Sequence, residues 1–136
     1  MSEQNHFETV RGYLDDLEVN IDHEDTVATL FRISDVERGI ANMLVDCEDD
    51  LLVIEQVILE VSGDDGTFYK RLLQMNRELV HGAFVLDEQA KWVLFRDTLQ
   101  LANLDLNELE ASVNALGLGL ASYAEELIQF ANGSAA

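Results

Sequence analysis

Three histidines are the residues best suited by type to acid-base or metal chemistry in this 136-residue chain. Histidine changes its charge near neutral pH, so it commonly serves as a general base or a metal ligand. His6, His23 and His81 are scattered along the sequence, and none of them stands at ligand spacing from another. The sequence therefore predicts no catalytic role for them, and we expect that the protein is not an enzyme.

Two acidic segments could bind a divalent cation through their carboxylates. They are "DHED" at residues 22–25 and "DCEDD" at residues 46–50. The second lacks the glycine and the spaced glutamate of a calcium loop, because Leu51 stands where glycine is needed. The alternative interpretation is two solvated hairpin turns, in which aspartate is common. We favour turns and expect neither a metal ion nor a cofactor.

Nucleophile and phosphate-binding motifs are absent from the sequence. Cys47 has no CxxC partner and lies in an apolar, strand-like segment, which predicts a buried inert thiol. As the only cysteine, it allows no internal disulfide, which fits a reducing compartment. No serine lies in a GxSxG setting, and there is no GxxxxGK loop.

The net charge of −19 restricts the kind of partner that the protein can bind. It argues against nucleic acid and against an anionic membrane, and it suits a partner segment that is basic, or neutral and apolar. The alternative is simply a soluble acidic surface. The N-terminus lacks the basic and apolar parts of a secretory signal, and no apolar run could span a bilayer, so we expect a cytoplasmic protein.

Hydrophobic spacing predicts three helices, which must position whatever site exists. The first runs from about Glu3 to Leu17, with Ser2 as its cap. The second is capped by Asp65 or Thr67 and ends at Gly82, which can adopt the left-handed conformation. Asp105 or Asn103 caps the third helix, which carries a long apolar stripe, a row of small residues and two glycines, Gly117 and Gly119. Such glycines usually allow close approach of another backbone.

Short alternating runs predict six strands, four before the second helix and two after it. In each of the first three runs, one set of residues is expected to share a strand face: Val19, Ile21 and His23; then Val27, Thr29, Phe31 and Ile33; then Ala41, Met43, Val45 and Cys47. The run "LLVIEQVILEV" is apolar on both faces and is predicted to be a central strand.

These elements predict an α+β fold, in which a single antiparallel sheet carries helices at the N-terminus, in the middle and at the C-terminus. The order is helix, four strands, helix, two strands, helix. The helices are expected to cover apolar sheet surface, with Trp92, or its neighbours Val93 and Phe95, in the core. Residues 1–131 are predicted to form one domain, followed by a flexible tail at residues 132–136.

The third helix is apolar over a wide arc, with a second row at Leu106, Leu118, Ala121, Ala124 and Ile128. A helix of this kind buries more than one face, either within its own chain or against a partner. We expect a homodimer with the second or third helix at the contact. The residues predicted for partner or dimer contact are Phe68, Leu72, Met75, Leu116, Gly119, Leu120 and Tyr123.

The run "YKRLLQMNRELVHGAFVLDEQAKWVLFRDTLQLANLDLNELEASVNALGLGLASYAEEL" resembles the YbjN family and the wider superfamily of type III secretion chaperones of the Tir-type, CesT-like kind. The shared pattern is a leucine-rich helix containing Asn76, then Gly82-Ala83-Phe84, an acidic turn, a strand reaching Arg96 and a final amphipathic helix. The resemblance covers Lys70 to Leu127 well and extends loosely to the N-terminal elements.

This resemblance implies a secretion-chaperone-like fold that commonly dimerises and binds a polypeptide without catalysis. In those chaperones an extended part of an exported protein wraps the dimer and adds strands or apolar contacts. The four strands predicted before the second helix look more like the YbjN family, whose role has been described as regulatory. Two functions are therefore expected as alternatives: a chaperone-like or adaptor protein, and a regulatory protein without a client.

Overall fold

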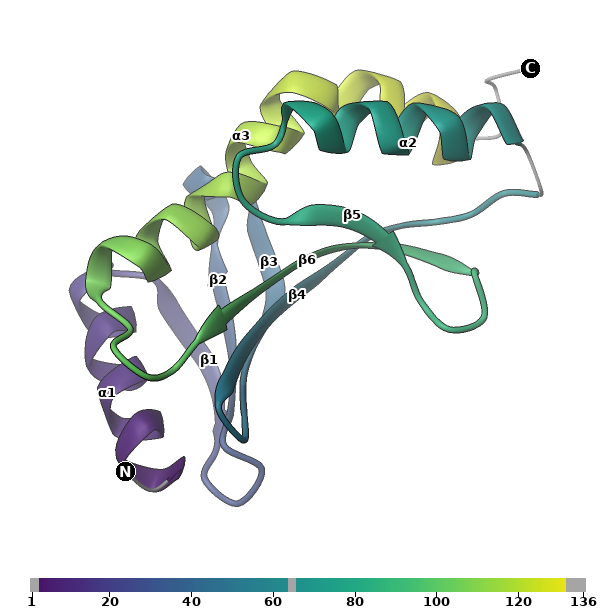
Figure 1. Ribbon diagram of the computed structural model, residues 1–136. Coiled ribbons are helices and arrows are strands. Elements are labelled where there is room, and N and C mark those ends of the chain that lie inside the picture. The colour runs from purple at the N-terminus through teal and green to yellow at the C-terminus, as the bar shows by residue number, and fades with distance from the viewer. Residues whose placement is uncertain (1–2, 64–65, 132–136) are drawn as a thin grey trace.

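The computed structural model describes residues 3–63 and 66–131 (Figure 1). Its helices are α1 (Glu3–Asp16), α2 (Gly66–Glu78) and α3 (Leu106–Ala131), with a short 3-10 helix, η1 (Val36–Arg38). Its strands are β1 (Asn20–Asp25), β2 (Leu30–Asp35), β3 (Ile40–Glu48), β4 (Leu51–Glu60), β5 (Ala83–Leu86) and β6 (Trp92–Gln100). The order of helices and strands is the predicted one. Ser2, Asp65 and the predicted tail lie outside the described residues.

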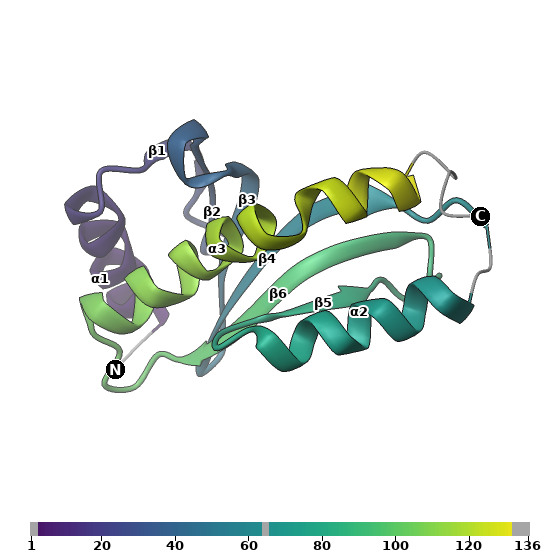
Figure 2. The same cartoon turned by 90° about the horizontal axis from the view of Figure 1, so that it is seen from above.

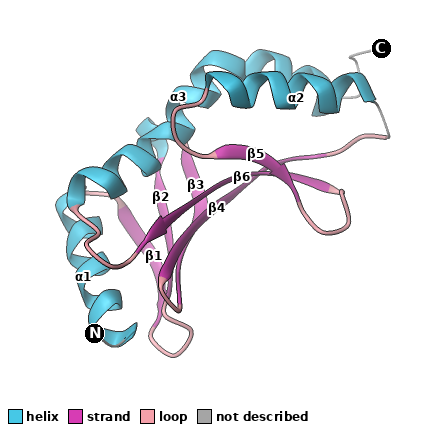
Figure 3. Cartoon of the chain, viewed as in Figure 1, coloured by secondary structure: helices cyan, strands magenta, loops and turns pink. Residues whose placement is uncertain are grey.

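All six strands form one antiparallel sheet, in the order β1-β2-β3-β4-β6-β5 (Figure 3). The α+β prediction is therefore confirmed. β4 lies between β3 and β6, which confirms that the long apolar run is an interior strand. β1 and β5 are the two edges of the sheet.

The three helices lie on one side of the twisted sheet. Across β2, β3, β4 and β6 the register places four side chains in one row on that side, Phe31, Val45, Ile54 and Asp97. Phe7 of α1 stacks on Phe31 with ring centroids 4.3 Å apart, and Ser112 of α3 donates a hydrogen bond of 2.7 Å to Asp97. The opposite face of the sheet carries no helix over the described residues.

α3 spans the length of the sheet and joins its two ends (Figure 2). Its N-terminal end lies near α1, where the Tyr13 hydroxyl donates to the carbonyl of Leu104 at 3.1 Å. Its C-terminal end lies beside α2, where the rings of Phe68 and Phe130 have centroids 4.5 Å apart. Val93 and Phe95 of β6 are fully buried beneath the helices, as predicted, whereas Trp92 is half-buried on the other face.

The start of α3 and Gly117 follow the prediction, whereas a Cβ at Gly119 would meet the side chains of Leu79 and Phe84, not a backbone. The Asp105 carboxylate accepts a 2.8 Å hydrogen bond from the Glu108 backbone N–H, so Asp105 is the cap and Asn103 is not. A Cβ at Gly117 would lie only 2.5 Å from the backbone oxygen of Arg38. Gly117 therefore allows close approach of the η1 backbone, as the sequence predicted.

The first hairpin differs from its prediction. The "DHED" segment belongs to strand β1 and does not form a turn. The turn lies at residues 26–29, because the Asp25 carboxylate accepts hydrogen bonds of 3.0 Å from both Val27 N and Ala28 N. Val27, predicted to share a face of the next strand with Phe31 and Ile33, instead lies in this turn and is 94% exposed.

β3 carries an irregularity that the alternating pattern did not predict. The pairing of β2 with β3 shifts between Ile33 and Asp35, and Asn42 has a positive φ of 53°. Because of this bulge Ile40 is buried, whereas Ala41, predicted to share a strand face with Met43 and Val45, is exposed.

The end of α2 also differs. The helix stops at Glu78, four residues before Gly82, which lies in the turn leading into β5. Gly82 does have a left-handed φ of 73°, and a Cβ there would collide with the ring of Phe95. The glycine is therefore needed for the turn and for close packing, and it does not terminate the helix directly.

Candidate partner-binding surface

The structure does not bring the three histidines together. His6 lies on α1, His23 on β1 and His81 in the turn after α2, and the last two are exposed. Within residues 3–63 and 66–131, no group of three or more His, Cys, Asp or Glu side chains could hold a metal ion. Cys47 is buried on the helix-covered side of β3, as predicted.

Asp25, the last residue of "DHED", has a structural role. Hydrogen bonds from the backbone N–H groups of Ala28 and Val27 lower the pKa of its carboxyl group. On the same strand, Arg11 of α1 donates two hydrogen bonds to the Glu24 carboxylate, at 2.8 and 2.6 Å, and so lowers the pKa of Glu24. The Asp25 carboxylate therefore binds the backbone of the β1–β2 turn, and the Glu24 carboxylate joins β1 to α1.

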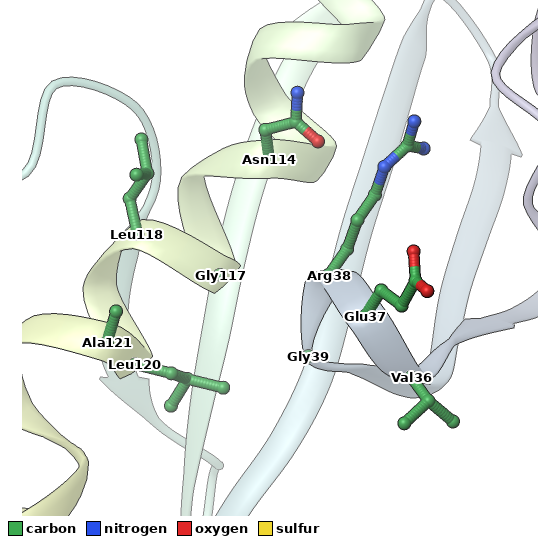
Figure 4. Close-up of a pocket in the computed structure, with 9 residues that line it drawn as sticks. All are labelled: Val36, Glu37, Arg38, Gly39, Asn114, Gly117, Leu118, Leu120 and Ala121. Atoms are coloured by element: carbon green, nitrogen blue, oxygen red, sulfur yellow. The ribbon is translucent and has the colours of Figure 1, made fainter.

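A groove of about 590 Å³ lies between η1 and α3 and is here called the α3 groove (Figure 4). Gly117 lies in this groove, at the point where the η1 backbone comes close to the helix. Its walls are residues 36–39 on one side and, on the other, the α3 residues Asn114, Gly117, Leu118, Leu120 and Ala121. Leu120 points from α3 towards η1, and its Cδ1 would lie 3.5 Å from a Cβ at Gly39.

Leu118 lines a second hollow as well. This smaller cavity, of about 150 Å³, lies between α3 and the end of α2, and it is bordered by Leu79, Val80, Gly119 and Tyr123. Leu118 is 72% exposed, and Val36 on the opposite wall of the α3 groove is 92% exposed. Two large apolar side chains are thus presented to solvent, one on each wall of the groove.

A third hollow lies along α2 and the edge strand β5. It has a volume of about 270 Å³ and is lined almost entirely by apolar side chains, those of Tyr69, Leu72, Leu73, Phe84, Val85 and Leu86. Leu73 is 71% exposed on the outer side of α2. This part of the molecule offers a second apolar surface, separate from the α3 groove.

The β5 edge is partly closed by a side chain of α2. The Asn76 amide donates to the carbonyl of Phe84 at 3.1 Å and accepts from the Phe84 backbone N–H at 2.8 Å. These two backbone groups are the ones that an added strand would bond at this residue. A partner strand cannot pair with β5 at Phe84 unless it displaces Asn76.

The predicted contact residues divide into two groups. Phe68, Leu72, Met75, Leu116 and Gly119 are buried within the chain. Leu120 and Tyr123 are half-buried, the first in the α3 groove and the second in the neighbouring hollow. The contact predicted for these residues stays a prediction, but the exposed apolar surface is made mainly by their neighbours.

Val36 and Leu73 are the residues that the sequence reasoning missed. Val36 is the one large apolar residue in the polar link "SDVERG", and that exception was the available signal. Leu73 follows the buried Leu72 directly, so a helix must point the two side chains in different directions. No helix in the described part of the chain has the length and apolar character needed to cross a membrane.

Comparisons with known proteins agree with this fold. The model of the family CesT_Tir_1 matches residues 3–133. No match was found among curated protein sequences.

Three solved structures are similar over most of their length. The crystal structure of YbjN from E. coli has a TM-score of 0.67 at 14% identity, covering 89% of this chain and 92% of YbjN. An uncharacterized protein from Methanothermobacter thermautotrophicus has a TM-score of 0.64 at 16% identity, covering 92% and 99%. A chain of the HopA1–SchA chaperone–effector complex has a TM-score of 0.61 at 14% identity, covering 89% and 96%. At these identities the matches show the fold.

Proposed function

Because this chain belongs to the CesT_Tir_1 family, we propose that it is a non-enzymatic, chaperone-like or adaptor protein that binds an extended or amphipathic segment of a partner protein. A structure of the same fold comes from a chaperone–effector complex, which supports a polypeptide as the partner. We further propose that the protein works in the cytoplasm, in keeping with its single buried cysteine.

The observation that carries the proposal is the position of Leu118. Its exposed side chain stands between the α3 groove and the smaller hollow beside α2. An apolar side chain of a partner segment on either side would be in contact with Leu118, and one in the α3 groove would also reach Val36. Covering such side chains contributes about 25 cal/mol for each Å² of apolar area removed from water.

The β5 edge supports the same choice of surface. Because Asn76 already satisfies the backbone of Phe84, adding a strand there requires those two hydrogen bonds to break. Docking beside α3 requires no such loss. We therefore favour the helix groove over the β5 edge as the place where a partner segment binds.

The net charge of −19 defines the chemistry of the segment more closely. A basic segment would be steered to the protein at low ionic strength, and its association would slow as salt screens the charge. A segment that is apolar at the contact and basic around it fits both features.

Affinity capture with matched variants tests this function. Leu118→Asp and Val36→Asp place a charge beside the α3 groove at exposed positions, so the fold and its circular dichroism should not change. Both should lose the polypeptides that the unaltered chain captures from lysate. Val27→Asp is the control, because Val27 is equally exposed but lies in the β1–β2 turn. Equal capture by all three variants would contradict the proposal.

We also propose that the protein is a homodimer, with α2 at the contact. The apolar hollow along α2 and β5, together with the exposed Leu73, offers a surface that a second copy could cover. Light scattering after size exclusion should report twice the chain mass of 15.2 kDa. Leu73→Asp should give a monomer and Val27→Asp should remain a dimer. A monomeric unaltered chain at high micromolar concentration would rule the contact out.

A regulatory protein without a client is the second candidate. The four strands before α2 favour it, since that arrangement was the feature that resembled YbjN, which is described as a candidate transcription regulator. If capture recovers no polypeptide above background while a small molecule or metal ion raises the melting temperature, the regulatory function is the better account.

A further inference from the structure

The bare face of the sheet is not uniformly polar. The register places Leu44 of β3 opposite Glu55 of β4, and Glu55 opposite Arg96 of β6. The next row joins Asp46 to Val53. These side chains point away from the three helices, because their neighbours along each strand form the core.

Part of this face is a hollow of about 200 Å³, here called the outer-face hollow. It is lined by Leu44, Asp46, Glu48, Val53, Glu55 and Arg96. Leu44 and the nearby Val57 of β4 are among the exposed large apolar residues of the chain. The hollow thus combines an apolar rim with three carboxylates and one guanidinium.

The charges in the outer-face hollow are unbalanced. Arg96 donates a 2.8 Å hydrogen bond to the Glu55 carboxylate, so these two charges compensate each other. Asp46 and Glu48 take part in none of the ion pairs among the described residues. The other cation on this face, Arg32 of β2, is exposed and lies opposite Leu44, in the row of Glu55 and Arg96.

The crowding of carboxylates is visible in the protonation of Asp46. Partial burial, a side-chain hydrogen bond with Glu48, and the negative charges of Glu48 and Glu55 together raise the pKa of Asp46 to about 6. Ionisation of Asp46 is therefore less favourable than that of an ordinary aspartate. A cation placed in the outer-face hollow would remove that penalty.

We propose that the outer-face hollow takes the basic side chain of an arginine or lysine in a partner polypeptide, with the apolar neighbours of that residue resting on Leu44 and Val57. The charge complementarity of Asp46 and Glu48 selects a cation, and the apolar rim selects a polypeptide segment. The inference deepens the proposed function and rests on it, because it adds a second contact for the same class of partner. The outer-face hollow and the α3 groove lie on opposite faces of the sheet. One extended partner segment must therefore pass around an edge of the sheet to reach both.

The affinity of this contact depends on pH in a defined direction. Binding of a cation requires an ionised Asp46, so it is strongest above the pKa of about 6 and weakens below it. The charged groups that face Asp46 are Glu48 on its own strand, Glu55 of β4 and Arg96 of β6, and Arg32 of β2 lies one row away. No helix of the described residues packs over them.

A nuclear magnetic resonance titration tests the inference with a defined probe. The probe is the capped tripeptide acetyl-Leu-Arg-Leu-amide, and its control contains citrulline, which has the shape of arginine without its charge. The arginine probe should shift the backbone amide resonances of residues 44–48 and 53–55. Its affinity should fall by up to about tenfold between about pH 7.5 and about pH 5, since one pKa unit corresponds to a tenfold change.

Variants identify the groups responsible. The double variant Asp46→Asn, Glu48→Gln should abolish these shifts, and Glu8→Gln, at an exposed position on α1, should leave them unchanged. Equal binding of the citrulline probe, or shifts confined to other residues, would overturn the inference. So would equal shifts produced by magnesium chloride alone, which would indicate a simple cation site.

The titration also separates this inference from the proposed function. The tripeptide needs no natural partner, and Leu118→Asp should bind it as the unaltered chain does. If the probe does not bind while capture through the α3 groove succeeds, only the outer-face inference fails. If the probe binds but no polypeptide is ever captured, the proposed function fails.

Discussion

Gly82 shows how much one residue determines in this fold. Its φ of 73° is unfavourable for any residue with a Cβ, and an added Cβ would lie 2.8 and 2.9 Å from the Cε2 and Cε1 atoms of Phe95. Phe95 is fully buried, so its ring has no free space to move into. We predict that Gly82→Ala lowers the free energy of unfolding by about 2–4 kcal/mol, measured by urea denaturation.

Gly12→Ala is the matched control for this substitution. Gly12 lies within α1, and nothing is within 4 Å of the position of its missing Cβ. The change should raise the free energy of unfolding by about 0.5–1 kcal/mol, because alanine is the better helix former. If both glycine substitutions had the same effect, the account of Gly82 would be wrong.

Asn76 protects the β5 edge through its two hydrogen bonds to Phe84. Asn76→Ala leaves the Phe84 N–H and C=O without these partners, which should cost about 1–3 kcal/mol of unfolding free energy. The exposed edge should also make the variant more prone to aggregate, measurable by static light scattering. Asn107→Ala, at an exposed site in the first turn of α3, should change stability by less than about 0.5 kcal/mol.

At the scale of elements, Asp46 of β3, which lies in the pairing of β3 with β4, makes the stability of the fold depend on pH. Asp46 has a raised pKa of about 6 in the folded chain, against an ordinary value of 3.8. The stabilisation that protonation provides is therefore complete below about pH 4 and is lost as the pH rises through about 6. Asp46→Asn should be more stable than the unaltered chain at pH 7, by about 1 kcal/mol after allowance for solvent screening.

Denaturation curves of both proteins between about pH 4 and about pH 7 measure this difference. It should shrink to nothing at the acidic end, because Asp46 is then protonated. A difference that grows as the pH falls would contradict the assignment of the raised pKa to Asp46.

The helices and the central strand could be predicted from sequence because their signals are local. The cap at Asp105 and the apolar stripe of α3 both depend on spacing within a few residues. The bulge near Asn42 could not be predicted from sequence. It results from a register shift between two strands, and the alternation of apolar and polar residues in the sequence gives no sign of it. The β1–β2 turn was misplaced because an aspartate can end a strand as well as occupy a turn.

At the scale of the whole molecule, the candidate site could be predicted only in part. The wide apolar arc of α3 pointed to that helix, which lines the proposed groove, and Leu118 was within its second row. The α3 groove itself joins residues 36–39 to residues 114–121, and no spacing rule brings such distant segments together. Burial of Phe68, Met75 and Leu116 likewise depends on which faces the sheet covers, which a helical pattern does not specify.

The central claim is that a partner polypeptide contacts Leu118, and photo-crosslinking tests it most directly. A p-benzoylphenylalanine in place of Leu118 can react only with groups that touch the α3 groove and the hollow beside it. The same residue in place of Val27 serves as the control at the β1–β2 turn. Irradiation in lysate should give covalent polypeptide adducts at Leu118 that diminish with salt, and none at Val27. Equal adducts at both positions, or none at Leu118 from a lysate in which the unaltered chain captures a polypeptide, would contradict the account.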